Sequence, residues 1–123
     1  MTRPRLTLLI ATAATAALAW SLPAIAHASA ATTTVKVTIG KPTEFHFQLS
    51  SSSVAKPGTV SFAVTNKGTL AHNFKIDGKK TPTLAPGKSA TLTVTFKKAG
   101  RYPYLCTIPG HAAAGMKGTL TVK

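Results

Sequence analysis

The chain has 123 residues, and 15 Lys and Arg against 2 Asp and Glu give it a formal net charge of +13 at pH 7. A hydrophobic content of 44% is that of a globular protein, so the charge does not indicate a disordered chain. The single Cys excludes an internal disulfide and an all-cysteine zinc site. Glu44 and Asp77, the two acidic residues, lie too far apart in sequence to suggest a hydrolytic carboxylate pair. We therefore expect no enzymatic activity.

The first 26 residues have the composition of a secretory signal peptide. Arg3 and Arg5 precede an apolar run over residues 6–20, and small residues at cleavage spacing follow Pro23. An uncleaved membrane anchor is the alternative, because the apolar stretch is nearly long enough to span a bilayer. Pro23 and the small-residue exit favour cleavage.

We therefore expect a Sec-type signal peptide over residues 1–26, with cleavage possible up to residue 30, and a single domain over residues 31–123. The exported domain would lie in a periplasm or outside the cell. In either compartment an unpaired thiol, here Cys106, should be buried, cross-linked or bound to a ligand.

Apolar and polar residues alternate with a period of two along the domain, and no helical period competes with this pattern. In residues 90–96, four apolar residues alternate with three threonines. The same pattern recurs in residues 35–39, 45–49, 60–64, 72–76, 102–106 and 120–122. Turn pairs such as Pro57-Gly58 and Asp77-Gly78 separate these segments. Seven to eight short strands at this spacing predict an all-β fold, a Greek-key antiparallel β-sandwich.

Residues suited to metal binding gather in the last third of the chain, where Cys106, His111 and Met116 fall within eleven residues. A Pro-Gly pair inside this segment breaks any helix, so a loop between two strands must bring the side chains together. His72, at the start of an earlier strand, can add a second imidazole. Two His, one Cys and a weak axial Met form the ligand set of a mononuclear blue-copper site. Taken singly, Cys106 could be an inert buried thiol and Met116 core filling, but the combination favours copper.

These residues resemble the cupredoxins, the small blue-copper proteins of the plastocyanin, azurin and auracyanin type. The resemblance covers about residues 35–123 and rests on His72-Asn73-Phe74, Gly100-x-Tyr102-x-Tyr104-x-Cys106, Pro109-Gly110-His111 and Gly115-Met116. It implies one copper ion per chain, bound by His72, Cys106 and His111 with Met116 axial. The Cys-to-His spacing is that of azurin and auracyanin, whereas the His-to-Met spacing is that of plastocyanin and auracyanin. The nearest subfamily therefore stays open.

The resemblance also implies roles for neighbouring residues. Asn73 would pin the two ligand loops together, although it could be an ordinary outward-facing polar residue. Thr107 could donate a hydrogen bond near the sulfur. The partly exposed edge of His111 would be the electron port, within an apolar patch formed by Pro109, His111, Ala112, Ala113 and Ala114. The three alanines could instead simply fill a tight loop.

The two other histidines are not expected to join this site. His46 falls on the outward row of its segment, opposite Phe45 and Phe47, and should face solvent. Cleavage after Ala26 would make His27 the first residue of the mature chain, where its amine and imidazole could chelate Cu(II). The competing cleavage sites argue against that role.

The sequence thus predicts an exported carrier that moves one electron by cycling copper between Cu(II) and Cu(I). The alternatives are a copper-binding protein for storage, delivery or resistance, and a metal-free secreted binding sandwich. The dispersed positive charge suggests an acidic redox partner of the cytochrome or oxidase type, a weak contact with an anionic membrane surface, or merely a solvated surface. Nucleic-acid binding is disfavoured because the chain lacks Arg-rich segments interleaved with aromatic residues. We expect a monomer.

Overall fold

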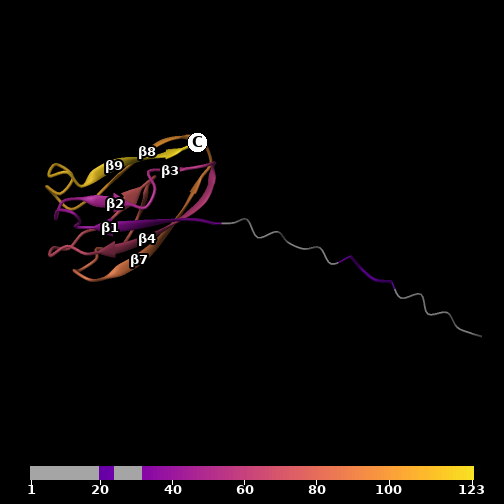
Figure 1. Ribbon diagram of the computed structural model, residues 1–123, viewed down its shortest axis with the longest axis horizontal. Helices are drawn as coiled ribbons and strands as arrows, with labels where there is room; N and C mark the ends of the chain where they lie inside the picture. Colours follow the sequence, from indigo (N-terminus) through magenta and orange to yellow (C-terminus); the bar gives the residue numbers. More distant parts are fainter. Residues whose placement is uncertain (1–19, 24–31) are drawn as a thin grey trace, which may run out of the picture.

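The computed structural model describes residues 20–23 and 32–123. These residues form nine strands: β1 (Thr33–Ile39), β2 (Phe47–Leu49), β3 (Ser53–Val54), β4 (Gly58–Asn66), β5 (Lys75–Ile76), β6 (Lys79–Lys80), β7 (Ser89–Phe96), β8 (Gly100–Leu105) and β9 (Lys117–Val122). They form two sheets, with strand orders β2-β1-β4-β7 and β3-β9-β8-β5-β6, that face each other as a sandwich (Figure 1).

Most of the expected signal peptide lies outside the described residues, so its cleavage stays a prediction. Within the part of the chain that the structure describes, no helix has the length and apolar character needed to cross a membrane.

The predicted all-β sandwich is confirmed, but its strand pairing differs from the expected antiparallel arrangement. β1 runs parallel to β4, and β3 runs parallel to β9, so both sheets are mixed. Alternation does not separate the two cases, because side chains alternate between faces in parallel and antiparallel strands alike. The described residues contain nine strands rather than seven to eight, because the two-residue strands β3 and β6 add to the seven segments that show the alternation.

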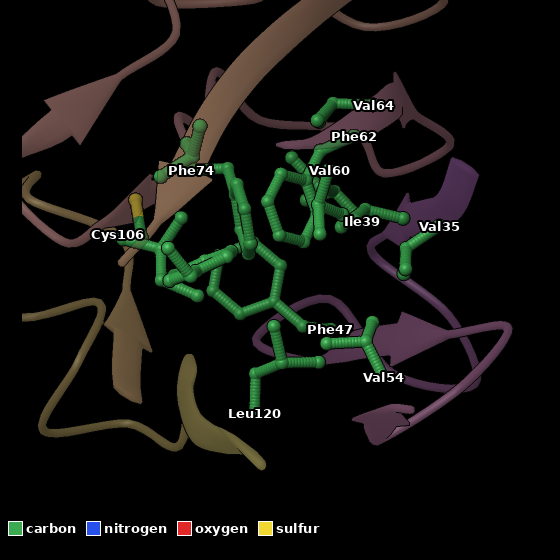
Figure 2. Packing of buried hydrophobic residues seen from close by; sticks show 14 of the residues in the cluster. Val35, Ile39, Phe47, Val54, Val60, Phe62, Val64, Phe74, Cys106 and Leu120 are labelled. Atoms are coloured by element: carbon green, nitrogen blue, oxygen red, sulfur yellow. The ribbon is translucent and has the colours of Figure 1, made fainter. Parts of the chain in front are cut away.

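Aromatic rings fill the space between the two sheets. The rings of Phe62 and Phe74 lie 5.3 Å apart, and those of Phe47 and Phe74 lie 5.4 Å apart. Figure 2 shows these rings inside the cluster of buried residues, with Cys106 at one edge of it. Because Phe74 lies two residues after His72, the core anchors the segment that carries this histidine as well as Cys106. Close packing of this kind gives the site a stiff base.

The loops that carry the candidate site lie together at one end of the sandwich, the left end in Figure 1: residues 40–46, 66–72 and 106–116. Gly40 has a φ of 80°, and a Cβ there would overlap the backbone of Gly68. The Lys67 N–H donates to the Ile39 carbonyl at 2.8 Å. The first two of these loops therefore touch backbone to backbone, which only glycine permits at residue 40.

Replacing Phe62, which is 0% exposed, with Ala should lower the free energy of unfolding by about 3–5 kcal/mol, because the ring leaves a cavity between the sheets. Urea unfolding of the metal-free protein measures this change. Thr93→Ala on the exposed outer face of the same sheet is the control, and should change stability by no more than about 0.5 kcal/mol. Equal stability of the two variants would contradict the described core.

Candidate metal centre

Three side chains converge where the loops meet. The ligand atoms of His72, Cys106 and His111 all lie within 4.8 Å of one another. The Nδ1 atoms of the two imidazoles are 3.0 Å apart, and the Cys106 Sγ is 3.6 Å from the His111 Nδ1. His72 and Cys106 are buried, whereas His111 is partly exposed. Two nitrogens and one sulfur thus face a common point, and His111 connects that point to the surface.

Strand pairing brings His72 close to Cys106 although 34 positions separate them. β5, which begins three residues after His72, pairs antiparallel with β8, which ends one residue before Cys106. The backbone of His72 is held by Leu84: each N–H donates to the other residue's carbonyl, at 3.1 and 2.7 Å. His72 therefore enters the site from a fixed backbone.

The loop from Cys106 to Met116 is closed by its own main-chain hydrogen bonds. The Cys106 N–H donates to the Met116 carbonyl, and the Met116 N–H donates to the His111 carbonyl, both at 3.1 Å. Gly110 and Gly115 have φ values of 84° and 120°, in the left-handed region that glycine adopts without strain. The Met116 side chain is 0% exposed. All three residues that the sequence grouped in this loop are thus tied to one another through the backbone.

Asn73 and Thr107 form a pair of hydrogen bonds beside the site. The Asn73 Nδ2 donates to the Thr107 Oγ1 at 2.7 Å, and the Thr107 N–H donates to the Asn73 Oδ1 at 2.8 Å. The two bonds join the residue after His72 to the residue after Cys106, which is the contact that the expected role of Asn73 requires. The N–H of Thr107 thus donates to Asn73 and not to the sulfur, while a hydrogen bond from its hydroxyl to the sulfur stays a prediction.

Phe45 covers both imidazoles. Its ring packs edge-on against His111 at a centroid distance of 5.2 Å and against His72 at 6.3 Å. Burial lowers the pKa of His111, and the neighbouring His72 lowers it further, while Glu44 opposes the change. A lowered pKa favours the neutral imidazole, which is the form that binds a metal.

Glu44 is a candidate functional residue that the sequence pattern did not identify. Alternation grouped it with His46, which is exposed as predicted, but Glu44 lies in a turn before β2, where strand alternation no longer applies. Its Oε1 is 2.6 Å from the Nε2 of His72. Hydrogen bonds lower the pKa of Glu44 to about 2: the Thr69 N–H contributes most, followed by His72 and the Leu70 N–H. The sequence feature that could have indicated a role for Glu44 is the scarcity of acidic residues, 2 against 15 Lys and Arg.

The residues expected around the electron port reach the surface. Pro109, Ala113 and Ala114 are exposed, and His111 and Ala112 are partly exposed. Leu70, two residues before His72, is 45% exposed and adds a larger apolar side chain at this end of the sandwich.

A β-sandwich with nitrogen and sulfur ligands grouped at its loop end is the architecture of a small metalloprotein. The chain belongs to the cupredoxin-like domain family, whose model matches residues 8–122. It is 52% identical over 50 residues to the copper-resistant cuproprotein CopI of Pseudomonas aeruginosa, covering 41% of this chain and 28% of that protein. It is also 52% identical over 42 residues to auracyanin-B of Chloroflexus aurantiacus, covering 34% and 18%.

Both matches thus span less than a third of the relative's length. Among solved structures, the reduced auracyanin of Roseiflexus castenholzii superposes with a TM-score of 0.62 and 25% identity, covering 77% of this chain and 99% of that one.

Asn73→Ala removes both bonds between the two ligand segments, and Asn73 is only 2% exposed. We expect the metal-free variant to lose about 1–3 kcal/mol of unfolding free energy, measured by urea unfolding. Thr107→Ser keeps the backbone donor and the hydroxyl acceptor, so it should stay close to the unaltered protein. An Asn73→Ala variant as stable as Thr107→Ser would show that the pair contributes nothing.

Proposed function

We propose that the protein is a type 1, or blue, copper protein that carries single electrons between redox partners. The observation that carries this proposal is the convergence of two imidazole nitrogens and one thiol sulfur within 4.8 Å. Two of these residues, Cys106 and His111, lie on a loop that also contains buried Met116. The thiol and thioether suit Cu(I), and the imidazoles tolerate Cu(II). A bound copper ion would supply the one-electron change.

The side chains fit copper better than a hard cation. Ca²⁺ and Mg²⁺ take oxygen ligands, but the nearby carboxylate of Glu44 already accepts hydrogen bonds from four donor groups. In this proposal His72, Cys106 and His111 hold the ion and Met116 is its weak axial ligand. Their backbones are fixed by hydrogen bonds on both sides of the site, so the ligands move little when the charge at the site changes. We propose that the protein transfers electrons without catalysing a substrate reaction.

His111 would be the route for the electron. Its ring is the partly exposed member of the group, and it lies within the apolar patch formed by Pro109, His111, Ala112, Ala113 and Ala114. A small apolar contact suits a partner that must dissociate after each transfer.

The charge indicates the chemistry of that partner. Twelve lysines and Arg101 lie between residues 32 and 123, against Glu44 and Asp77. We propose an acidic redox protein, of the cytochrome or oxidase type, whose association is accelerated at low ionic strength. We further propose that the protein acts as a monomer and is exported by a Sec-type signal to a periplasm or the cell exterior.

Copper titration of the domain should give an intense thiolate-to-copper absorption band that saturates at one copper per chain. Ascorbate should bleach the band, and an oxidant should restore it. Cys106→Ser should abolish the band, whereas Met116→Leu should keep copper and raise the reduction potential. Weak colour, with Cys106 still open to a thiol reagent, would contradict the blue site. A Met116→Leu protein that binds no copper would contradict the axial assignment.

Copper handling is the second candidate function, and the likeness to the copper-resistant cuproprotein favours it. An electron carrier should keep its Cu(I) when mixed with a metal-free copper acceptor, and it should exchange electrons rapidly between its own oxidised and reduced forms. A delivery protein should instead lose Cu(I) to the acceptor on the time scale of mixing. The copper content of the two proteins after separation distinguishes these outcomes.

A further inference from the structure

The proposed function assigns no role to Glu44. This residue contacts both the loop before His72 and the ring of His72 itself. Its Oε2 accepts hydrogen bonds from the Thr69 N–H at 2.8 Å and from the Thr69 hydroxyl at 3.0 Å. Its Oε1 accepts one from the Leu70 N–H at 3.0 Å and lies 2.6 Å from the Nε2 of His72. One carboxylate therefore holds both the loop before His72 and the outer nitrogen of its ring.

These contacts determine which nitrogen of His72 is free. An ionised carboxylate only accepts hydrogen bonds, so the Nε2 of His72 must carry the proton of the 2.6 Å contact. A neutral imidazole has one N–H, so the Nδ1 is left with its lone pair. That nitrogen lies 3.0 Å from the Nδ1 of His111, on the side where the candidate ligands meet. Glu44 thus selects the tautomer in which the ligand nitrogen of His72 is unprotonated.

Hydrogen bonds with a buried side chain hold the loop of residues 66–72 in the conformation that contacts the Glu44 carboxylate. Asn66 is 0% exposed, and its Nδ2 donates to the carbonyls of Leu70 and Leu84, both at 2.8 Å. Its Oδ1 accepts the Gly68 N–H at 2.9 Å. A Cβ at Gly68 would overlap the carboxylate of Glu44. The absence of a side chain at Gly68 therefore leaves the space that the carboxylate occupies.

We propose that Glu44 is a positioning residue of the metal centre, whose carboxylate fixes the tautomer and orientation of His72 and places a negative charge behind it, so that the site binds Cu(II) more tightly and at a lower reduction potential. This inference rests on the proposed copper site. The contact raises the basicity of the ligand nitrogen. The charge favours the more positive oxidation state, and its effect is strengthened because His72, which separates it from the metal position, is buried.

Glu44→Ala should weaken Cu(II) binding by roughly 10–100-fold, the usual cost of losing such a contact. A tenfold loss confined to Cu(II) corresponds to a rise of about 59 mV in the potential of a one-electron couple. Competition with a chelator measures the affinity, and voltammetry measures the potential. Asp77→Asn is the matched control: it removes the other acidic charge, in the turn between β5 and β6, and should leave both quantities unchanged.

Glu44→Gln separates position from charge. Its side-chain oxygen can still accept the proton of His72, so Cu(II) affinity should fall less than in Glu44→Ala, while the reduction potential should still rise. Nitrogen-15 chemical shifts of His72 in the metal-free protein report the tautomer directly. We expect the Nε2–H form in the unaltered protein and in Glu44→Gln, and a mixture of both tautomers in Glu44→Ala.

Gly68→Ala tests the same contact without altering a charged residue. The added methyl should displace the carboxylate and reproduce the mixed tautomer of Glu44→Ala, and it should have no further effect when combined with Glu44→Ala. If Glu44→Ala does not fold, Gly68→Ala and Glu44→Gln still give the answer. Unchanged His72 shifts, affinity and potential in the folded variants would overturn the proposal. Failure of the unaltered protein to turn blue would overturn the copper function instead, while the shifts of the metal-free protein would still test the contact.

Discussion

The site depends on holding two imidazole nitrogens 3.0 Å apart, and a thiol close to them, although His72 and Cys106 are buried. Polar groups brought together in this way lose hydration, and unpartnered ones are costly. The buried imidazole, that of His72, therefore needs partners on its far side. His72 is held by the carboxylate of Glu44 and by its backbone pairing with Leu84. Among the described residues that are not exposed, every buried side-chain nitrogen and oxygen has a hydrogen-bond partner, so the arrangement is satisfied without strain on its polar groups.

Stiffness of this kind has a direct bearing on function. If the ligands are already in place, a change of charge at the site requires little movement of the protein, which suits electron transfer. A delivery protein gains from the opposite property, because release requires the ligands to separate. The aromatic core beneath Cys106, the Asn73–Thr107 pair and the closed loop up to Met116 all resist such separation. These contacts support the proposed electron carrier over the copper-handling alternative, although copper-resistant cuproproteins are among the relatives.

Local pattern in the sequence was enough to predict the sandwich and the grouping of the candidate ligands. The alternating threonines of β7 and the spacing of Cys106, His111 and Met116 are both short-range signals, and the structure contains the strand and brings Cys106 and His111 together. The parallel pairings of β1 with β4 and of β3 with β9 were not predictable, because the alternation of apolar and polar residues is the same for parallel and antiparallel strands. Glu44 was missed for a related reason: its role depends on a loop more than twenty residues away, and no local period encodes such a contact.

The two histidines of the site have different surroundings. His72 is buried, and its outer nitrogen is bound to Glu44, so it meets the protein interior and the negative charge. His111 is partly exposed among small apolar residues, so in the proposed function it is the ring that a redox partner would meet. A partner that docks on the apolar patch need not touch the Glu44 contact, and a change at Glu44 need not alter the patch. If both proposals hold, copper affinity and reduction potential depend on the surroundings of His72, whereas partner recognition depends on the surroundings of His111. This separation also makes the contribution of Glu44 measurable on its own, since its variants leave the docking residues unchanged.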